Sequence, residues 1–288
     1  MNNILVTGSK GQLGSELRII SPSYKYNFFF TDKESLDISQ SALIKEFVEL
    51  NNINTIVNCA AYTAVDKAEE DEVNADKINH IAVKNLVEIA KEKNIKLVHI
   101  STDYVYDGKN YKPYTEDDIT NPNGVYGKTK LDGERAMLDI NPLNSIIIRT
   151  SWVYSSFGAN FVKTMLRLGK ERDSLGVIFD QVGTPTYAKD LAKAILDIIP
   201  RIDNTRVKIY NYSNEGVLSW YDFAKEIMRM AKIDCQINPI ETKEYPTPAK
   251  RPHYSLLNKS KIKEEFSILI PYWKDSLDRC LKIMGERK

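Results

Sequence analysis

Two residues with complementary acid–base chemistry, Tyr126 and Lys130, lie four positions apart in the segment Tyr126-Gly-Lys-Thr-Lys130. On a helix, this spacing places both side chains on one face. An isolated tyrosine hydroxyl titrates near pH ~10. A nearby ammonium group lowers that pKa and makes the donation and return of a proton easier. The pair therefore predicts proton transfer, although an exposed helical Tyr/Lys pair explains these two residues equally well when they are taken alone.

A glycine-rich turn near the start of the sequence predicts a site for the phosphates of a nucleotide. The apolar run Ile4–Val6 is followed by Gly8, Gly11 and Gly14. Glycines at this spacing allow a tight turn and a close approach of the backbone to a pyrophosphate. The helix that follows supplies amide donors and the positive end of its dipole. Because the turn joins a strand to a helix, it predicts a dinucleotide cofactor more strongly than glycine content alone would.

The second apolar run ends at Asp32, where a contact with the adenosine ribose is expected in such a fold. The Asp32 carboxylate would accept from the ribose hydroxyls and disfavour a 2′-phosphate, whereas Lys33 would offset that repulsion. Asp37 is a second acidic candidate, which would border the adenine. A solvated turn is the alternative interpretation of Asp32. The sequence therefore leaves NADPH and NADH equally open as the cofactor.

Short apolar runs alternate with amphipathic segments, which predicts an α/β fold with a doubly wound parallel sheet of the Rossmann type. The expected strands are Ile4–Val6, Phe28–Phe30, Thr55–Asn58, Lys96–Ile100 and Ile146–Arg149, with later ones at Val177–Phe179 and Val207–Tyr212. The expected helices are Gln12–Ile20, Ser41–Leu50, Ala75–Lys93 and Tyr126–Leu138. We expect a Rossmann domain at 1–150 and a smaller C-terminal α/β substrate-binding domain at 151–288. Some later strands are expected to return to the Rossmann sheet.

Composition excludes several classes of function. The 288 residues carry 40 basic and 39 acidic side chains, and this net charge of +1 gives no field that attracts nucleic acid or an anionic membrane. Cys59, Cys235 and Cys280 are scattered, which argues against disulfides and structural zinc. The first residues show no export signal, and no metal-binding pattern is apparent. We therefore expect a reduced, cytoplasmic enzyme without a catalytic metal.

Two hydroxyls, Ser101 and Thr102, follow the expected fourth strand at the edge of the sheet where ligands bind. Either hydroxyl could hydrogen-bond a substrate carbonyl and hold it toward Tyr126. The chain order is glycine turn, Asn58-Cys-Ala-Ala, Ser-Thr and then Tyr-x-x-x-Lys. In this order the chain resembles the extended branch of the short-chain dehydrogenases/reductases, which acts mainly on nucleotide sugars.

Further segments narrow the resemblance to the dTDP-4-dehydrorhamnose reductase family over nearly the whole chain. They are Asn58–Glu69, Ser101–Gly108, Val125–Lys130, Arg149–Tyr154, Asn160–Arg167 and Asp180–Thr186. The resemblance implies an NADPH- or NADH-dependent reduction of the 4-keto group of a nucleotide sugar, the last step in making dTDP-L-rhamnose. The resemblance is also compatible with a homodimer.

By this resemblance, Tyr126 is the proton donor, Thr102 places the carbonyl, and Lys130 tunes Tyr126 and anchors the ribose. Together with Asp32 and Asp37, which follow from their place after the second strand, the predicted cofactor contacts are Gly8, Gly11, Gln12, Leu13, Ala60, Ala61, Thr63, Tyr126 and Lys130. The substrate contacts implied by the resemblance are Val65, Thr102, Asp103, Tyr126 and Trp152, and the chemistry of its guanidinium adds Arg251.

Several of these residues have a structural interpretation as well. Trp152 could be part of a domain interface, and Arg251, whose guanidinium suits a diphosphate, could be a solvated surface residue. Asn79 could hydrogen-bond backbone near the site or satisfy a buried turn. His99 lies within an apolar strand and is interpreted as a core histidine.

Two other functions compete with the reductase. An epimerase or dehydratase of the same branch would recycle its cofactor, and dehydratases usually have an acidic residue where this chain has Tyr104. A non-catalytic NADP-binding regulatory subunit would have no need of a proton donor, and retention of Tyr126 argues against it.

Overall fold

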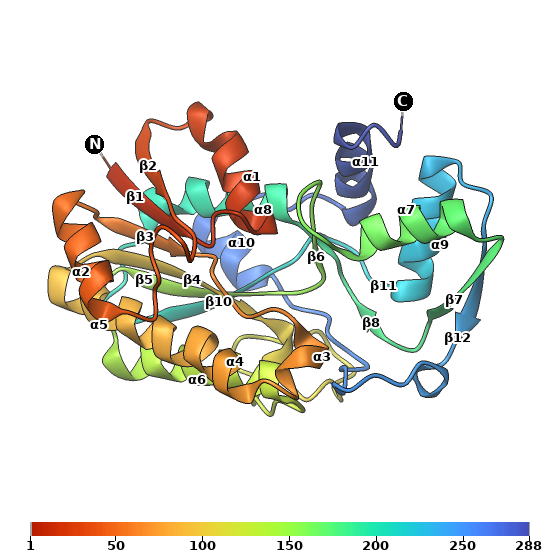
Figure 1. Cartoon of the computed structure of the whole chain (residues 1–288), viewed down its shortest axis with the longest axis horizontal. Helices are drawn as coiled ribbons and strands as arrows, with labels where there is room; N and C mark the ends of the chain where they lie inside the picture. Colours follow the sequence, from red (N-terminus) through yellow and green to blue (C-terminus); the bar gives the residue numbers. More distant parts are fainter. Residues whose placement is uncertain (1, 288) are drawn as a thin grey trace.

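A parallel sheet of six strands is the centre of the fold in the computed structural model, which describes residues 2–287 (Figure 1). The strand order is β10-β5-β4-β3-β1-β2, with every neighbouring pair parallel. The strands are β1 Asn2–Thr7, β2 Tyr26–Phe30, β3 Thr55–Asn58, β4 Lys96–Thr102, β5 Ser145–Thr150 and β10 Lys208–Tyr212. The predicted Rossmann-type sheet is confirmed.

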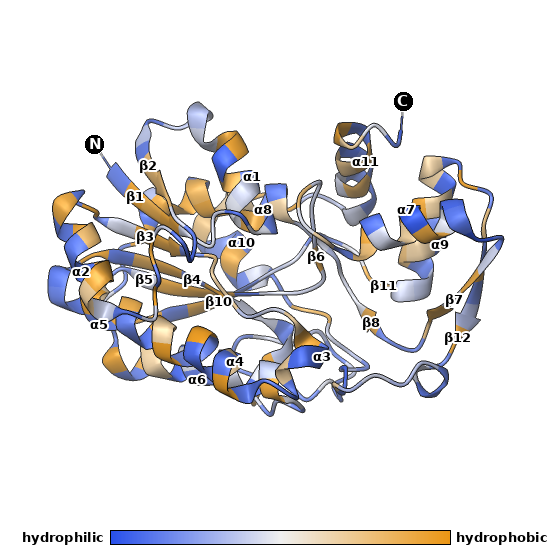
Figure 2. Cartoon of the chain, in the orientation of Figure 1, coloured by the Kyte–Doolittle hydropathy of each residue, from blue (hydrophilic) through white to orange (hydrophobic). Residues whose placement is uncertain are grey.

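Helices cover both faces of this sheet because side chains alternate between its faces along each strand. Ile4 and Val6 pack toward one side with Leu191, whereas Leu5 packs toward the other with Leu86. The first side is covered by α1 Gln12–Ile20, α8 Ala188–Ile198 and α10 Ser260–Phe266. The second is covered by α2 Ser41–Leu50, α5 Ala82–Lys93 and α6 Val125–Ile140. Figure 2 shows the apolar residues concentrated in the strands and on the helix sides that face them.

The long helix expected at 75–93 is interrupted. It consists of α4 Glu72–Asp76, a π-helical turn at Lys77–Ile81 and α5, after the short helix α3 Val65–Ala68. A π turn carries one extra residue and is often found at functional sites. Within this turn, the buried side chain of Asn79 forms hydrogen bonds to another segment of the chain, as described below.

The second lobe contains a separate apolar core between three helices and short strand pairs (right side of Figure 1). Its helices are α7 Phe161–Glu171, α9 Trp220–Ala231 and α11 Trp273–Ile283. Its strand pairs are β6 Val153–Tyr154 with β9 Thr186–Tyr187, β7 Ser174–Ile178 with β12 Gln236–Ile240, and β8 Val182–Gly183 with β11 Leu218–Ser219. Short 3-10 turns lie at Ser21–Ser23, Asp103–Val105, Ile199–Arg201 and Thr242–Glu244.

The chain crosses between the lobes more than once. After the strand expected at Val177–Phe179, which becomes β7 in the second lobe, the chain returns to the sheet as α8 and β10. Among residues 2–287, no helix combines the length and apolar character needed to cross a bilayer. The boundary at residue 150 stays a prediction, and residues 188–212 lie in the Rossmann layer.

Candidate functional site

One cavity of about 860 Å³ runs along the carboxyl ends of β1, β3, β4 and β5. Fifteen of the sixteen residues predicted for the site line it: Gly8, Gly11, Gln12, Leu13, Asp32, Asp37, Ala60, Ala61, Thr63, Val65, Thr102, Asp103, Tyr126, Lys130 and Trp152. The glycine turn and the Tyr126–Lys130 pair therefore border the same space. Arg251 is the one predicted residue outside this lining.

The glycine turn leaves no room for side chains where the chain leaves β1. Gly8 has a φ of +65°, and a Cβ on it would lie 2.6 Å from the Ala60 nitrogen. A Cβ on Gly14 would meet the Gly8 carbonyl oxygen at 2.5 Å. Gly11 is the N-cap of α1 and contributes no side-chain cap. The first-turn amides of α1 thus form a cradle that suits a diphosphate.

Thr102 and Tyr126 meet at the end of β4. The Thr102 hydroxyl donates to Asp103 Oδ1 at 3.0 Å and accepts from the Tyr104 amide at 3.2 Å. The Tyr126 ring packs edge-on against Tyr104, with ring centroids 5.4 Å apart. Tyr126 is held in place by α6, whose first amide, that of Val125, donates to the Glu69 carboxylate at 2.9 Å.

Tyr126 and Lys130 are both desolvated in the wall of the cavity. Burial raises the pKa of Tyr126 to about 12, although a hydrogen bond with Thr102 opposes the rise. Lys130 Nζ donates to the Ile100 carbonyl at 2.6 Å. Burial lowers the pKa of Lys130 to about 8. The effect of Lys130 on the pKa of Tyr126 therefore stays a prediction, with both groups desolvated and Lys130 Nζ directed to a carbonyl.

Asp103 is a buried acid at the edge of the cavity. Its exposed fraction is 2%, and its Oδ2 has no hydrogen-bond partner among the residues that the structure describes. Burial raises the pKa of Asp103 to about 7. A carboxyl group with this pKa changes its charge in the range where enzymes usually work.

Replacing Asp103 with asparagine is expected to make stability less dependent on pH. Below about pH 7 the folded protein keeps a proton that the unfolded chain loses near pH ~4, so the free energy of unfolding falls as pH rises through this window. The gain in stability of Asp103→Asn over the parent protein should therefore be larger at about pH 8 than at about pH 5. Urea unfolding at both pH values measures it.

Asp107→Asn is the matched control. A hydrogen bond from the Lys109 amide lowers the pKa of Asp107, so the pH range in which Asp107 affects stability is more acidic. If the free energy of unfolding depended on pH in the same way in Asp103→Asn and in the parent protein, the raised pKa of Asp103 would be contradicted.

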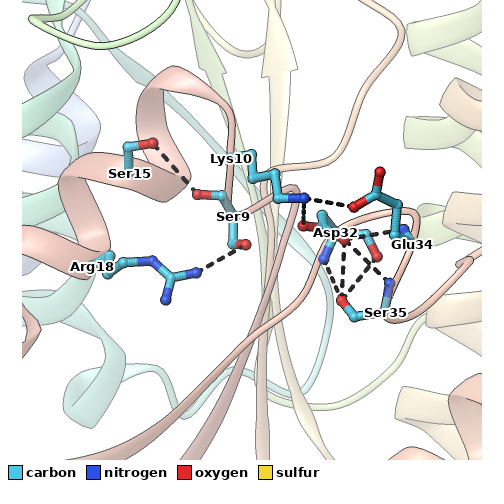
Figure 3. Close-up of polar contacts among 7 residues, drawn as sticks. All are labelled: Ser9, Lys10, Ser15, Arg18, Asp32, Glu34 and Ser35. Carbon is cyan, nitrogen blue, oxygen red and sulfur yellow. Dashed lines mark hydrogen bonds and ion pairs between the residues drawn. The ribbon is translucent and has the colours of Figure 1, made fainter.

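A basic residue that the sequence did not single out, Lys10, pairs with Asp32, which lines the cavity. Lys10 Nζ is 2.8 Å from Asp32 Oδ2 and 2.7 Å from Glu34 Oε2, as Figure 3 shows. Asp32 also accepts from the amides of Glu34 and Ser35, at 3.0 and 3.2 Å. These contacts lower the pKa of Asp32 to about 2. The expected ribose contact is therefore part of an ion-pair cluster in which Lys10, and not the neighbouring Lys33, partners the acid.

Asp37 and Arg18 make separate contacts outside this cluster. Asp37 lines the cavity, and its Oδ1 accepts from the Ser39 amide at 2.9 Å, which lowers the pKa of Asp37. Arg18 donates to the Ser9 hydroxyl at 3.2 Å (Figure 3) and lies over the Phe30 ring.

Asn79 has both of the roles that the sequence left open, a backbone contact near the site and the satisfaction of a buried turn. Its Oδ1 accepts from the Tyr62 amide at 2.9 Å, and its Nδ2 donates to the Tyr62 carbonyl at 3.1 Å and to Thr129 Oγ1 at 3.2 Å. It therefore satisfies buried backbone and also fixes the segment that carries Thr63 against α6, the helix that carries Tyr126.

Arg251 and Trp152 are held by partners from other segments. Arg251 forms a two-pronged ion pair with Asp66, with Nη2 to Oδ2 at 2.6 Å and Nη1 to Oδ1 at 3.0 Å. Trp152 stacks on Trp220 with ring centroids 3.7 Å apart, and its φ of +49° is unusual for a bulky residue. Trp152 is thus both an interface residue and part of the cavity wall.

A buried ion pair under the site was missed from the sequence. Glu134 and Arg149 are 0% and 3% exposed, and Arg149 Nη2 lies 2.6 Å from Glu134 Oε2. Glu134 also accepts from Ser101, and Arg149 from β5 donates to the Tyr106 hydroxyl at 2.7 Å. The one feature of the sequence that could have indicated this pair is the position of Glu134, four residues after Lys130 on the same helix face.

Known proteins with the same organisation match the chain over its full length. The family model described as RmlD substrate binding domain matches residues 1–285. The dTDP-4-dehydrorhamnose reductase of Aggregatibacter actinomycetemcomitans is 41% identical, over 96% of this chain and 97% of the relative.

Two solved structures agree with this match. The crystal structure of a dTDP-4-dehydrorhamnose reductase from Clostridium acetobutylicum has a TM-score of 0.93 and 42% identity, over 98% of this chain and 99% of its own. The one from Bacillus anthracis, in complex with NADP, has a TM-score of 0.92 and 36% identity, over 98% and 100%. The chain therefore belongs to the RmlD family, that of the dTDP-4-dehydrorhamnose reductases.

Proposed function

We propose that this protein reduces the 4-keto group of dTDP-4-dehydro-β-L-rhamnose to give dTDP-L-rhamnose, with NADPH or NADH as the reductant. The observation that carries the proposal is that Thr102, Tyr126 and Lys130 border the cavity that begins at the glycine turn. The family supplies the identity of the sugar nucleotide.

The residues around the turn fit a dinucleotide. Gly8 and Gly14 allow the tight backbone packing of the turn, and the N-terminus of α1 offers amide donors to the diphosphate. The proposed cofactor contacts are Gly8, Gly11, Gln12, Leu13, Asp32, Asp37, Ala60, Ala61, Thr63, Tyr126 and Lys130. When bound, the cofactor supplies a hydride to C4 of the sugar.

The chain's own residues then handle the oxygen of the substrate. Thr102 positions the carbonyl, Tyr126 donates its proton to the alkoxide oxygen that forms, and Lys130 anchors the nicotinamide ribose. Val65, Asp103 and Trp152 are proposed to contact the sugar. Arg251, which is paired with Asp66, is proposed to contact the diphosphate. The proposed division of labour places cofactor binding in 1–150, and the proposed substrate contacts come from both parts of the chain, with Trp152 and Arg251 supplied by 151–288.

A dehydratase of the same branch is the closest competing function. Tyr104 occupies the position where an acid would be needed, and its ring packs on Tyr126 without supplying a carboxylate. This favours the reductase.

The decisive experiment supplies the purified protein with dTDP-4-dehydro-β-L-rhamnose and either NADPH or NADH. We expect one cofactor to be oxidised for each dTDP-L-rhamnose formed, followed by the loss of absorbance and by product analysis. Product without net cofactor oxidation would instead indicate an epimerase or dehydratase. Cofactor binding without turnover would indicate a binding protein.

Lys10 is expected to decide how well a 2′-phosphate is accepted. In Lys10→Ala, Asp32 and Glu34 lose their counter-charge and repel that phosphate, so kcat/KM with NADPH should fall about tenfold relative to kcat/KM with NADH. Steady-state kinetics with both cofactors measures the ratio. Lys33→Ala is the control, because Lys33 lines the cavity whereas the ion pair with Asp32 is made by Lys10. An equal loss with both cofactors would remove Lys10 from cofactor selection.

A further inference from the structure

A chain of buried hydrogen bonds leads from β1 to Lys130 through His99. Asn58 Oδ1 accepts from the Ala60 amide at 3.2 Å and from the Thr7 hydroxyl at 2.6 Å. A backbone amide can only donate, so this atom of Asn58 is its carbonyl oxygen. The NH₂ group of Asn58 must therefore be the atom that faces His99 Nδ1, at 3.0 Å.

This orientation fixes the proton on the His99 ring. Because the Asn58 NH₂ group donates, His99 Nδ1 must accept and carries no hydrogen, so the ring proton is on Nε2. A doubly protonated ring would direct an N–H at the NH₂ group of Asn58. His99 is 0% exposed, and burial holds its pKa well below the ordinary value. His99 is therefore neutral, with its Nε2–H directed away from Asn58.

His99 Nε2 lies 3.5 Å from Lys130 Nζ. Lys130 Nζ also donates to the Ile100 carbonyl at 2.6 Å. A neutral amine satisfies both neighbours, because it donates to the carbonyl and accepts from the imidazole N–H. An ammonium satisfies only the carbonyl.

The other ionisable groups near Lys130 do not outweigh the effects that disfavour its ammonium form. Glu134, one turn further along α6, and the Cys59 thiol at the end of β3 both raise the pKa of Lys130, but burial outweighs them and leaves it at about 8.

We propose that His99 is a positioning residue that disfavours the charged form of Lys130 before the cofactor binds, so that above about pH 8 cofactor binding is coupled to the uptake of a proton by Lys130. The proposal rests on the cofactor site of the proposed function. The proton comes from solvent and converts the Lys130 amine to an ammonium, which can then donate to ribose hydroxyls and offset the negative charge of the diphosphate.

The tautomer is tested in the free protein, without cofactor. In ¹⁵N-histidine-labelled protein, we expect one of the three histidines, assigned through loss of its signal in His99→Phe, to show a protonated Nε2 and an unprotonated Nδ1. It should keep this form between about pH 6 and about pH 9. A His99 ring that carries its proton on Nδ1, or that titrates in this range, would overturn the proposal.

Proton uptake is tested by calorimetry of NADH binding in buffers with different ionisation enthalpies. NADH is chosen because its diphosphate does not titrate near neutral pH. We expect uptake of about half a proton or more for each NADH at about pH 8.5, and much less at about pH 6.5, where Lys130 is already charged.

Asn58→Asp separates Lys130 from other groups that take up protons. The carboxylate keeps the bonds to Thr7 and Ala60 but accepts from His99 Nδ1, which moves the ring proton and leaves Nε2 free to accept from the Lys130 ammonium. Uptake at about pH 8.5 should then be mostly lost, whereas Asn238→Asp, the same change on β12, should preserve it.

Unchanged uptake in Asn58→Asp, or NADH binding without uptake in the parent protein, would refute the inference while leaving the proposed function intact. Failure to bind either NADH or NADPH would refute the proposed function itself.

Discussion

Tyr126→Phe is expected to lower turnover by about 10²–10⁴-fold, the usual contribution of general acid catalysis, while cofactor binding persists. The substitution removes only the hydroxyl that would protonate the alkoxide oxygen. The phenyl ring can keep its edge-on packing against Tyr104. The measurements are kcat with the ketosugar and the Kd of NADPH by calorimetry.

Tyr104→Phe is the matched control, since it removes a hydroxyl from the neighbouring ring in the same cavity. Its effect on kcat should be much smaller. Turnover that is unchanged in Tyr126→Phe would show that another group supplies the proton.

Breaking the Glu134–Arg149 pair should cause the largest loss of stability among single substitutions near the site. In Glu134→Leu, the Arg149 charge remains buried without its partner, which is expected to lower the free energy of unfolding by about 3–5 kcal/mol. Urea unfolding followed by circular dichroism measures the change. The double variant Glu134→Leu/Arg149→Met should recover most of the loss, because it removes the uncompensated charge along with the pair.

Glu171→Leu tests whether the effect depends on burial. Its partner is Arg167 at 2.9 Å, but the two side chains are 51% and 61% exposed. We expect this control to change the free energy of unfolding by no more than about 0.5 kcal/mol. A similar loss of unfolding free energy in Glu134→Leu and Glu171→Leu would mean that burial of the Glu134–Arg149 pair contributes little to the effect.

The sequence predicted the sheet well because the relevant signals are local. Each of the first five strands is a short apolar run, and the first two predicted helices, 12–20 and 41–50, have the observed ends. The ends of parallel strands meet at one edge of a sheet. The order of the strands along the chain was therefore enough to bring the glycine turn, Thr102 and the Tyr126–Lys130 pair to one place.

The features that could not be predicted depend on contacts between distant segments. The π turn exists where Asn79 bonds to Tyr62, which lies 17 residues earlier. The pair of Lys10 with Asp32 forms only after β1 and β2 are side by side, and that of Arg251 with Asp66 joins the two lobes. The protonation preference of Lys130 depends on the direction of one amide group, that of Asn58, which no residue pattern encodes.

The return of β10 to the sheet has a consequence for how this protein can be divided. A fragment that ended after β5 would lack β10, which pairs with β5 along 208–212, and α8, which covers α1. It would expose an unpaired strand edge and an apolar sheet face to water, both of which promote aggregation. The reductase chain is therefore expected to fold, unfold and be expressed as one unit, and a recombinant cofactor-binding fragment would need residues 188–212 to remain soluble.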